Sequence, residues 1–315
     1  MKSETTLPRP TGRDAFEWPT WAVLSVCYGL FALVLSFWTV AWPLIAIPAA
    51  IAVALHSSLQ HEVLHGHPTR NRILNELLVA LPLGLFIPYR RFRDLHLKHH
   101  NDERLTDPHD DPESFYLEPK AWGTFSPLAR LLFTVNATFV GRLTIGPALA
   151  MFGFWRAEIR LMRAGDRAVL GAWVRHAIGV AVMLIILWDA AVPLWQYILF
   201  AAYPGLSLIM VRSFIEHRAA EDAPHRTAVV EACMFWRLLF LNNNFHAVHH
   251  DLPSVAWYKL GALWRADRDS VLSRNGGYLI PGYGAVLRRW GLRQREPVVH
   301  PFGEFPPPPL PRDPQ

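Results

Sequence analysis

The sequence predicts an all-α integral membrane protein with four transmembrane helices and a cytoplasmic helical cap that carries a histidine-rich metal site. Three observations predict it. Two long stretches of the 315-residue chain are almost free of charge, histidines gather in three short clusters, and lysines and arginines avoid the two predicted outer turns. The composition agrees, because 51% of the residues are hydrophobic and only 18% are charged, a balance that is unusual for a soluble domain.

The first charge-free stretch runs from Trp21 to Gln60. These 40 residues contain no Lys, Arg, Asp or Glu, which is enough for two membrane crossings of roughly 20 residues each. We place helices near 20–40 and 43–61, with the turn between them at Trp42-Pro43. Residues 1–19, which precede the first helix, form a polar N-terminal arm.

Three segments of different character follow the first pair of helices. Residues 73–88 are apolar but short and contain Pro82, which favours a re-entrant or interfacial segment over a full crossing. Residues 101–127 are acidic and rich in proline and are predicted to form a loop. Residues 128–164 alternate apolar and basic patches, which is typical of amphipathic helices that lie on lipid headgroups. Their arginines are Arg130, Arg142, Arg156, Arg160 and Arg163.

The second charge-poor stretch carries a single charge, Asp189, between Ala177 and Val211. Asp189 and Pro193 mark a turn, so we place the third and fourth helices near 172–189 and 193–213.

The membrane domain predicted in this way covers residues 20–265. Residues 266–315 form a cytoplasmic C-terminal segment that ends in a disordered proline-rich tail.

Charge asymmetry predicts the orientation of the four helices. Lys and Arg number 3 before Trp21, 15 from His61 to Arg175 and 13 from Arg212 onward, which accounts for all 31 in the chain. The two outer turns carry none. By the positive-inside rule, both termini and every histidine cluster face the cytoplasm. The basic face can attract anionic headgroups, which we favour, or an acidic redox partner.

Three histidine clusters are the strongest functional signal in the chain. HLKHH at 96–100 and HAVHH at 246–250 have spacings of i, i+3 and i+4, which place three imidazoles on one face of a helix. HEVLH at 61–65 has the looser i, i+4 spacing. Eight histidines are too many for one ion, so they indicate two metals or a large shared cage. His217 is a ninth candidate, because it follows the fourth predicted helix as His61 follows the second.

The remaining histidines are weaker candidates. His176, His225 and His300 are predicted to lie at the surface or at the level of the headgroups, and His109 is predicted to be solvated. His56 and His67 lie beside the first cluster, and the sequence does not decide whether they join it.

The type of ligand narrows the choice of metal. The only cysteines, Cys27 and Cys233, lie away from the clusters, which argues against thiolate zinc sites, iron–sulfur sites and a disulfide framework. A shell of imidazoles suits two irons that activate oxygen. Nearby acids are candidates to accept the outer N–H of a ligating imidazole. These acids are Glu62, Asp94, Asp102, Glu216 and Asp251. One of Asn242, Asn243 and Asn244 is a candidate to hold a metal-bound water, with a turn or cap role as the alternative.

The three boxes, their order and the four-helix layout resemble the membrane fatty acid desaturases, a group that includes integral-membrane hydroxylases and carotenoid-modifying oxygenases. The resemblance covers about residues 20–265. The stretch NNNFHAVHHD at 242–251, followed by Trp257-Tyr258, is similar to bacterial members. We therefore expect a protein of the bacterial inner membrane that acts on lipids.

The resemblance implies a di-iron centre that activates O2 and removes hydrogen from an unactivated C–H bond of an acyl chain. It also implies an apolar tunnel for the chain and electrons from a ferredoxin, a rubredoxin or a cytochrome b5 with its reductase. It implies no catalytic residue apart from the metal ligands, and we predict no nucleic-acid partner. The implied ligands are His61, His65, His96, His99, His100, His217, His246, His249 and His250.

Some residues depart from the acyl-CoA desaturases within this group. The first box is HxxxH where many of those enzymes have HxxxxH, and Ser213 stands where some have Asn. Glu216-His217 is similar to alkane hydroxylases. A hydroxylase or ketolase acting on alkanes, fatty acids or carotenoids is therefore the alternative to a desaturase. A non-enzymatic membrane metal-binding protein is the alternative from another class.

Overall fold

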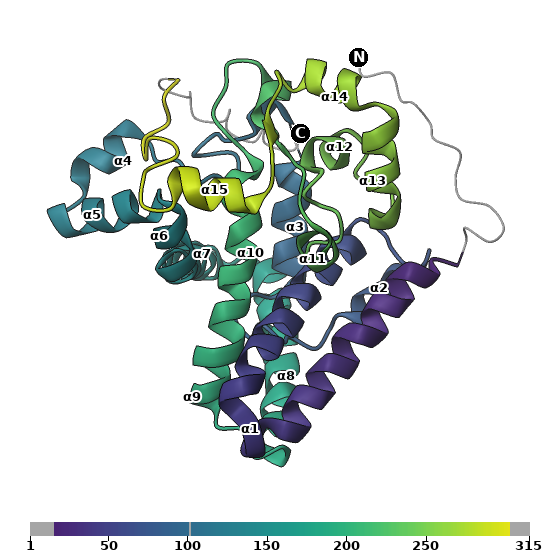
Figure 1. Ribbon diagram of the computed structural model, residues 1–315. Coiled ribbons are helices and arrows are strands. Elements are labelled where there is room, and N and C mark those ends of the chain that lie inside the picture. The colour runs from purple at the N-terminus through teal and green to yellow at the C-terminus, as the bar shows by residue number, and fades with distance from the viewer. Residues whose placement is uncertain (1–15, 101, 303–315) are drawn as a thin grey trace, which may run out of the picture.

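The computed structural model describes residues 16–100 and 102–302 of the chain (Figure 1). Most of the predicted N-terminal arm and the whole proline-rich tail lie outside this range. Most of the described chain is helical. Its two short strands, β1 (Val229–Val230) and β2 (Leu279–Ile280), pair in parallel with Val229 opposite Leu279. The predicted predominance of helix is confirmed.

The first apolar stretch folds as one element, α1 (Trp18–Leu64), that doubles back on itself. The backbone of Ala41 leaves the helical region, with φ −141° and ψ 29°. Pro43 follows within the helix, where a proline removes a backbone hydrogen bond and favours a kink. The two arms contact each other, because the Cys27 thiol lies 3.5 Å from the carbonyl oxygen of Ala52. Figure 1 shows α1 turning at the lower end of the molecule.

The second apolar stretch forms α8 (Arg167–Asp189) and then α9 (Leu194–Tyr197), the π-helical η3 (Ile198–Ala202) and α10 (Tyr203–Glu216). The last three are continuous. Within the described residues, three elements are long and apolar enough to cross a membrane: α1, α8 and the continuous unit Leu194–Glu216. The sequence predicted four transmembrane helices. The count differs because the first two predicted helices, near 20–40 and 43–61, are the two arms of the single kinked element α1.

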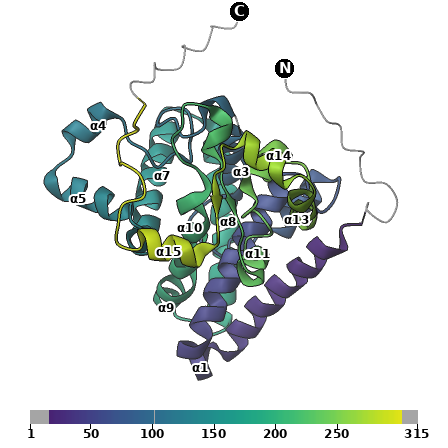
Figure 2. The same cartoon turned by 45° about the horizontal axis from the view of Figure 1, so that its top comes forward.

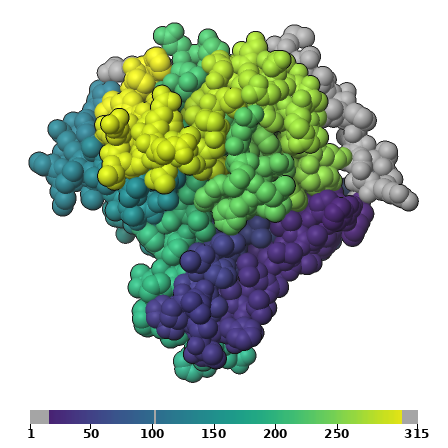
Figure 3. Space-filling view, in the orientation of Figure 1, coloured from purple at the N-terminus to yellow at the C-terminus, as the bar shows by residue number. Residues whose placement is uncertain are grey.

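Large apolar side chains cover the outside of these helices. Val40 is 81% exposed, Leu44 80% and Trp188 88%. Apolar surface on this scale needs a cover other than water, and lipid supplies it. Figure 3 shows the apolar helices as a narrow stem below a wider cap. The chain is therefore built as an integral membrane protein.

Helices that are mostly short form the cap above the stem. Figure 2 shows two of them, α4 and α5, projecting at one side. Those that follow the stem helices or lie between them are α2 (Arg72–Leu78), α3 (Tyr89–His99), η2 (Asp102–Arg104), α4 (Pro119–Thr124), α5 (Pro127–Asn136), α6 (Phe139–Thr144), α7 (Gly146–Arg163), η4 (Ala223–Arg226), α11 (Met234–Leu239), α12 (His246–Asp251), α13 (Trp257–Ala266), α14 (Arg268–Arg274) and α15 (Tyr283–Trp290).

Two stem helices lead into the core of the cap. Leu59 of α1 and Phe214 of α10 belong to one buried apolar cluster with Phe240 and Ile280 of the cap. Ser58 of α1 donates its hydroxyl to the carbonyl oxygen of Leu239 at 2.7 Å. The ends of α1 and α10 are therefore held inside the cap, and each end carries a histidine of interest.

Candidate metal centre

Four helices carry the nine histidines that the sequence singled out, either within the helix or at its C-terminal end. His61 lies in the last turn of α1, and His65 is the first residue beyond that helix. The second box lies on α3 and its C-cap, and the third box lies on α12. His217 caps the C-terminus of α10. The fold therefore brings together the ends of two stem helices, α1 and α10, and two cap helices, α3 and α12.

The nine side chains form two adjoining groups, and within each group one nitrogen per ring lies within 4.8 Å of all the others. The five-histidine group contains His61, His65, His96, His100 and His249. The four-histidine group contains His99, His217, His246 and His250. The split follows helix geometry. Residues i and i+4 on α3 and on α12 enter the same group, and the residue at i+3 enters the other.

The facing nitrogens are spaced as ligands of a common ion. The Nε2 atoms of His100 and His96 are 3.0 Å apart, and those of His217 and His246 are also 3.0 Å apart. Metal–imidazole bonds are about 2.0–2.1 Å long, so two ligands at a right angle lie about 3 Å apart. Nε2 of His65 is buried and has no hydrogen-bond partner in the described chain. These donors fit a metal in each group.

Three outer contacts fix which ring nitrogen carries the proton. Nδ1 of His99 lies 2.8 Å from the carboxylate of Asp111, and Nδ1 of His96 lies 2.8 Å from Glu113. Nδ1 of His246 lies 2.9 Å from the Oδ1 of Asn243. An acceptor at Nδ1 holds the proton there and leaves the lone pair of Nε2 for a metal. The outer partners therefore orient the rings toward the two groups.

The sequence missed two of these three partners. Asp111 and Glu113 lie in the acidic stretch predicted to be a loop, which folds back over α3 and includes η2 and α4. Asn243 is one of the three asparagines that the sequence flagged, but it holds a histidine rather than capping a helix. Its position three residues before His246 was a usable signal.

The acids predicted for this role have different surroundings, and one of them, Glu216, lies beside a candidate ligand. The carboxylate of Glu62 accepts the backbone N–H of Trp257 at 2.9 Å. Asp94 pairs with Arg93, and Asp251 pairs with Arg274. Glu216 is the acid that lies near a candidate ligand, with its Oε1 3.3 Å from the Nδ1 of His246. The side chain of Asp102 lies outside what the structure describes.

Burial keeps most of the candidate ligands neutral. It lowers the pKa of His96, His246 and His249, and neighbouring imidazoles add to this effect for the last two. His99 differs. Burial also acts to lower its pKa, but the carboxylates of Glu113 and Asp111 outweigh it and raise the pKa to about 9. Neutral imidazoles are the form that binds metal.

His56 and His67 stand apart from both groups. Nε2 of His56 lies 3.3 Å from the hydroxyl of Tyr28 within the stem. Nδ1 of His67 lies 2.6 Å from Glu17, and its Nε2 lies 4.0 Å from Glu62. Burial opposes protonation of His67, but the two carboxylates raise its pKa. This buried cluster ties the start of α1 to the first histidine box.

The other histidines are also outside the two groups. His176 contacts the carbonyl oxygen of Leu85, and His109 contacts the carboxylate of Glu118. His225 lies near Asp222. His300 was predicted at the surface, but it is 5% exposed and contacts the hydroxyl of Thr106.

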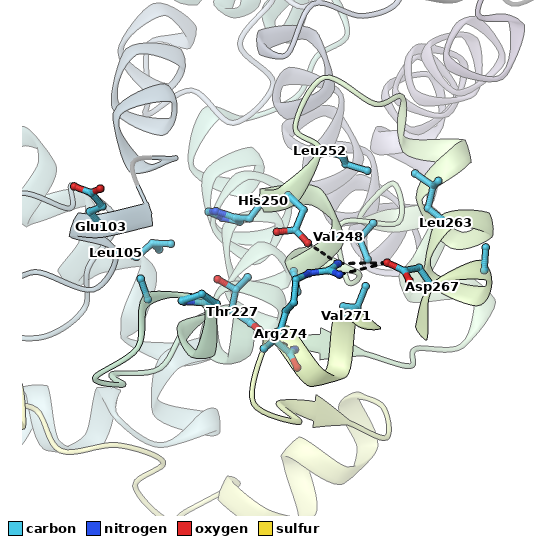
Figure 4. Close-up of a pocket in the computed structure, with 16 residues that line it drawn as sticks. Glu103, Leu105, Thr227, Val248, His250, Leu252, Leu263, Asp267, Val271 and Arg274 are labelled. Carbon is cyan, nitrogen blue, oxygen red and sulfur yellow. Dashed lines mark hydrogen bonds and ion pairs between the residues drawn. The ribbon is translucent and has the colours of Figure 1, made fainter. Parts of the chain in front are cut away.

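A cavity of about 790 Å³ opens beside the four-histidine group. Its lining is mostly apolar and includes Leu105, Val248 and Leu263, with His250 among the lining residues. Figure 4 shows His250 and the ion pair between Arg274 and Asp267 among the residues that line the cavity. The volume lies in the range of small-molecule sites. The cavity lies in the cap, between α12, α13, α14 and the segment that contains η4.

The family model described as Fatty acid desaturase matches residues 12–281. The matched range contains all nine histidines of the two groups. No curated protein matches the chain.

Proposed function

The chain belongs to the fatty acid desaturase family, and we propose that it is an oxygen-dependent oxidoreductase that introduces a C=C bond into the acyl chain of a fatty acid or lipid. The family membership and the apolar helices make it a membrane oxidoreductase with multiple histidine clusters. The observation that supports oxygen-dependent oxidation is the convergence of nine imidazoles into two adjoining groups. Imidazole-rich sites suit iron, and two neighbouring sites suit reactions of O2.

The nine histidines are the proposed ligands of two irons. When bound, the irons would activate O2 and remove hydrogen from an unactivated C–H bond. The protein's own contribution is placement. Asp111, Glu113 and Asn243 hold the rings of three histidines, and the burial of the cluster excludes bulk water from it. We assign no catalytic residue apart from these ligands.

The apolar cavity beside His250 is the proposed place for the acyl chain near the reacting carbon. Nine of its sixteen lining residues are apolar, and a hydrocarbon chain that enters it removes apolar surface from water. The sequence led us to expect a tunnel from among the helices. That tunnel stays a prediction, and the cavity in the cap supports an approach alongside α12 and α13.

Desaturation requires an external electron donor. Reduction of O2 to two waters takes four electrons, and the substrate supplies two when it loses two hydrogens. A ferredoxin, rubredoxin or cytochrome b5 type carrier would supply the other two. The positive-inside pattern supports a protein of a bacterial inner membrane whose cap faces the cytoplasm. The chain then crosses the membrane four times, if the two arms of α1 are counted separately. A soluble cytoplasmic carrier could then reach the cap.

A hydroxylase or ketolase on the same scaffold is the second candidate. Glu216-His217, which is similar to alkane hydroxylases, favours it, and Glu216 lies beside His246. Both reactions begin with the same hydrogen abstraction. They differ in whether a second hydrogen leaves or oxygen is transferred, which the position of the carbon decides.

Metal analysis of the purified protein tests the proposal. The protein would be expressed in a bacterial membrane, purified in mild detergent and analysed for iron and zinc. We expect about two irons per chain, one for each histidine group. Zinc in place of iron would favour the non-enzymatic metal-binding alternative, and no transition metal in repeated preparations would contradict the proposed metal centre.

A further inference from the structure

One face of α7 combines exposed arginines with exposed apolar side chains. Arg156, Arg160 and Arg163 are all exposed and follow one another at helical spacing. None of the three guanidinium groups has an ion-pair partner among the described residues. Phe152 is 66% exposed and Ile159 44% exposed on the same face. Together with Trp155, these side chains line a shallow cavity of about 650 Å³.

The opposite face of α7 is fixed to the rest of the protein. Glu158 is 1% exposed. It accepts two hydrogen bonds from Arg91 of α3, at 2.7 and 2.9 Å, and one from the indole of Trp173 of α8, at 3.0 Å. The buried ion pair fixes the orientation of α7. The arginines on its outer face are therefore exposed because of how the helix packs, and not because the helix is mobile.

The position of α7 places this face beside the membrane surface. Only residues 164–166 separate α7 from α8, which is long and apolar enough to cross a membrane. Figure 1 shows α7 at the lower edge of the cap, beside α10 of the stem. The Trp155 indole donates to the carbonyl oxygen of Phe86 at 3.1 Å, in the segment that the sequence predicted to be interfacial or re-entrant.

We propose that the outer face of α7 is a binding site for the headgroup of an anionic phospholipid. This face carries three guanidinium groups without a carboxylate partner among the described residues, and guanidinium groups bind phosphate oxygens through paired N–H donors. The apolar side chains between them match the glycerol and upper acyl region beneath that phosphate. An acidic protein would satisfy the arginines but would leave Phe152 and Ile159 without apolar partners, so the lipid is the better fit.

Native mass spectrometry of the full-length protein in detergent tests this site. The protein would be titrated with dioleoyl phosphatidylglycerol and, separately, with dioleoyl phosphatidylcholine. We expect the wild-type protein to retain the anionic lipid preferentially. The variant R156Q/R160Q/R163Q should lose this preference, with apparent affinity for the anionic lipid reduced by at least roughly tenfold, given the usual contribution of each basic residue near a membrane surface.

The matched control is R265Q/R288Q/R289Q, which removes the same charge from exposed positions on α13 and α15. It should keep the wild-type preference. Equal losses in both triple variants would mean that only net charge matters, and equal retention of the two lipids by the wild type would overturn the site. If the α7 triple variant fails to fold, as judged by gel filtration, the single variants R156Q and R160Q should each weaken the preference, and wild-type preference in both would also overturn it.

Discussion

The Nε2 atom of His217 lies 3.0 Å from the Nε2 atom of His99, although 118 residues separate the two histidines. His217 caps the end of a stem helix, and His99 lies on a short helix of the cap. Their contact requires α10 to extend beyond the apolar stem into the cap. The four-histidine group therefore depends on how the membrane helices are positioned relative to the cap.

Replacing His249 by Ala should abolish turnover and lower the iron content, because it removes one ring from the five-histidine group. Insertion into the membrane should be unchanged, since the substitution lies in the cap. The H225A variant, which changes a histidine outside both groups, is the control and should behave as wild type. Full activity in H249A would contradict the assignment of the ligands.

Replacing Asp111 by Asn should weaken metal binding on the order of 10- to 100-fold, the usual effect of losing an outer partner of a metal-binding histidine. Asn keeps the size of the side chain but removes the charge that holds the proton on Nδ1 of His99. The control is D94N, which alters a carboxylate on α3 that pairs with Arg93. Metal titration of both variants checks this, and an equal affinity in D111N and wild type would count against it.

Metal loading should release about one proton per chain at pH 7.5. The pKa of His99 is raised to about 9, so His99 is protonated below that pH and must lose its proton to bind a metal. The pKa values of His96, His246 and His249 are lowered, so these rings are already neutral at pH 7.5. The release should fall to none as the pH rises through about 9. Calorimetry in buffers of different ionisation enthalpy measures it.

Two results would contradict this proton count. Release of several protons at pH 7.5 would mean that more of the rings are protonated before metal binds. Release that stays constant from pH 7.5 to pH 10 would mean that the proton does not come from His99.

Replacing Ala266 by Trp should reduce turnover on the order of 10- to 100-fold without lowering the iron content. The indole would fill part of the cavity beside His250, and small displacements of a substrate near a reactive centre have effects of this size. The control is A262W, at an exposed position on the same helix that does not line the cavity. Equal activity in A266W and A262W would mean that the acyl chain does not use this cavity.

The histidines could be predicted from the sequence because helix periodicity alone groups them. His96 and His100 are four residues apart on one helix, and so are His246 and His250. Each pair enters one group in the structure. The apolar stretches were also readable, because a membrane requires long runs without charge.

The outer partners could not be predicted in the same way. Asp111 and Glu113 follow α3 through a segment without regular periodicity, and their position depends on a local turn. Thr106 adopts a positive φ of 71°, and its backbone N–H donates to Asp111 at 2.8 Å. The kink in α1 is a similar case. Pro43 marked its place, but whether the chain stays helical there depends on packing between the two arms.

Analysis of lipids by mass spectrometry is the most direct test of the central claim, that the two histidine groups support oxidation of an acyl chain. Total lipids would be compared between cells that express the wild-type chain, cells that express H249A and cells that express neither. We expect an acyl chain lighter by two hydrogen atoms in the wild type alone. A product heavier by one oxygen atom would favour the hydroxylase. Identical lipids in all three, from wild-type protein that contains iron and is supplied with a reduced electron carrier, would contradict the claim.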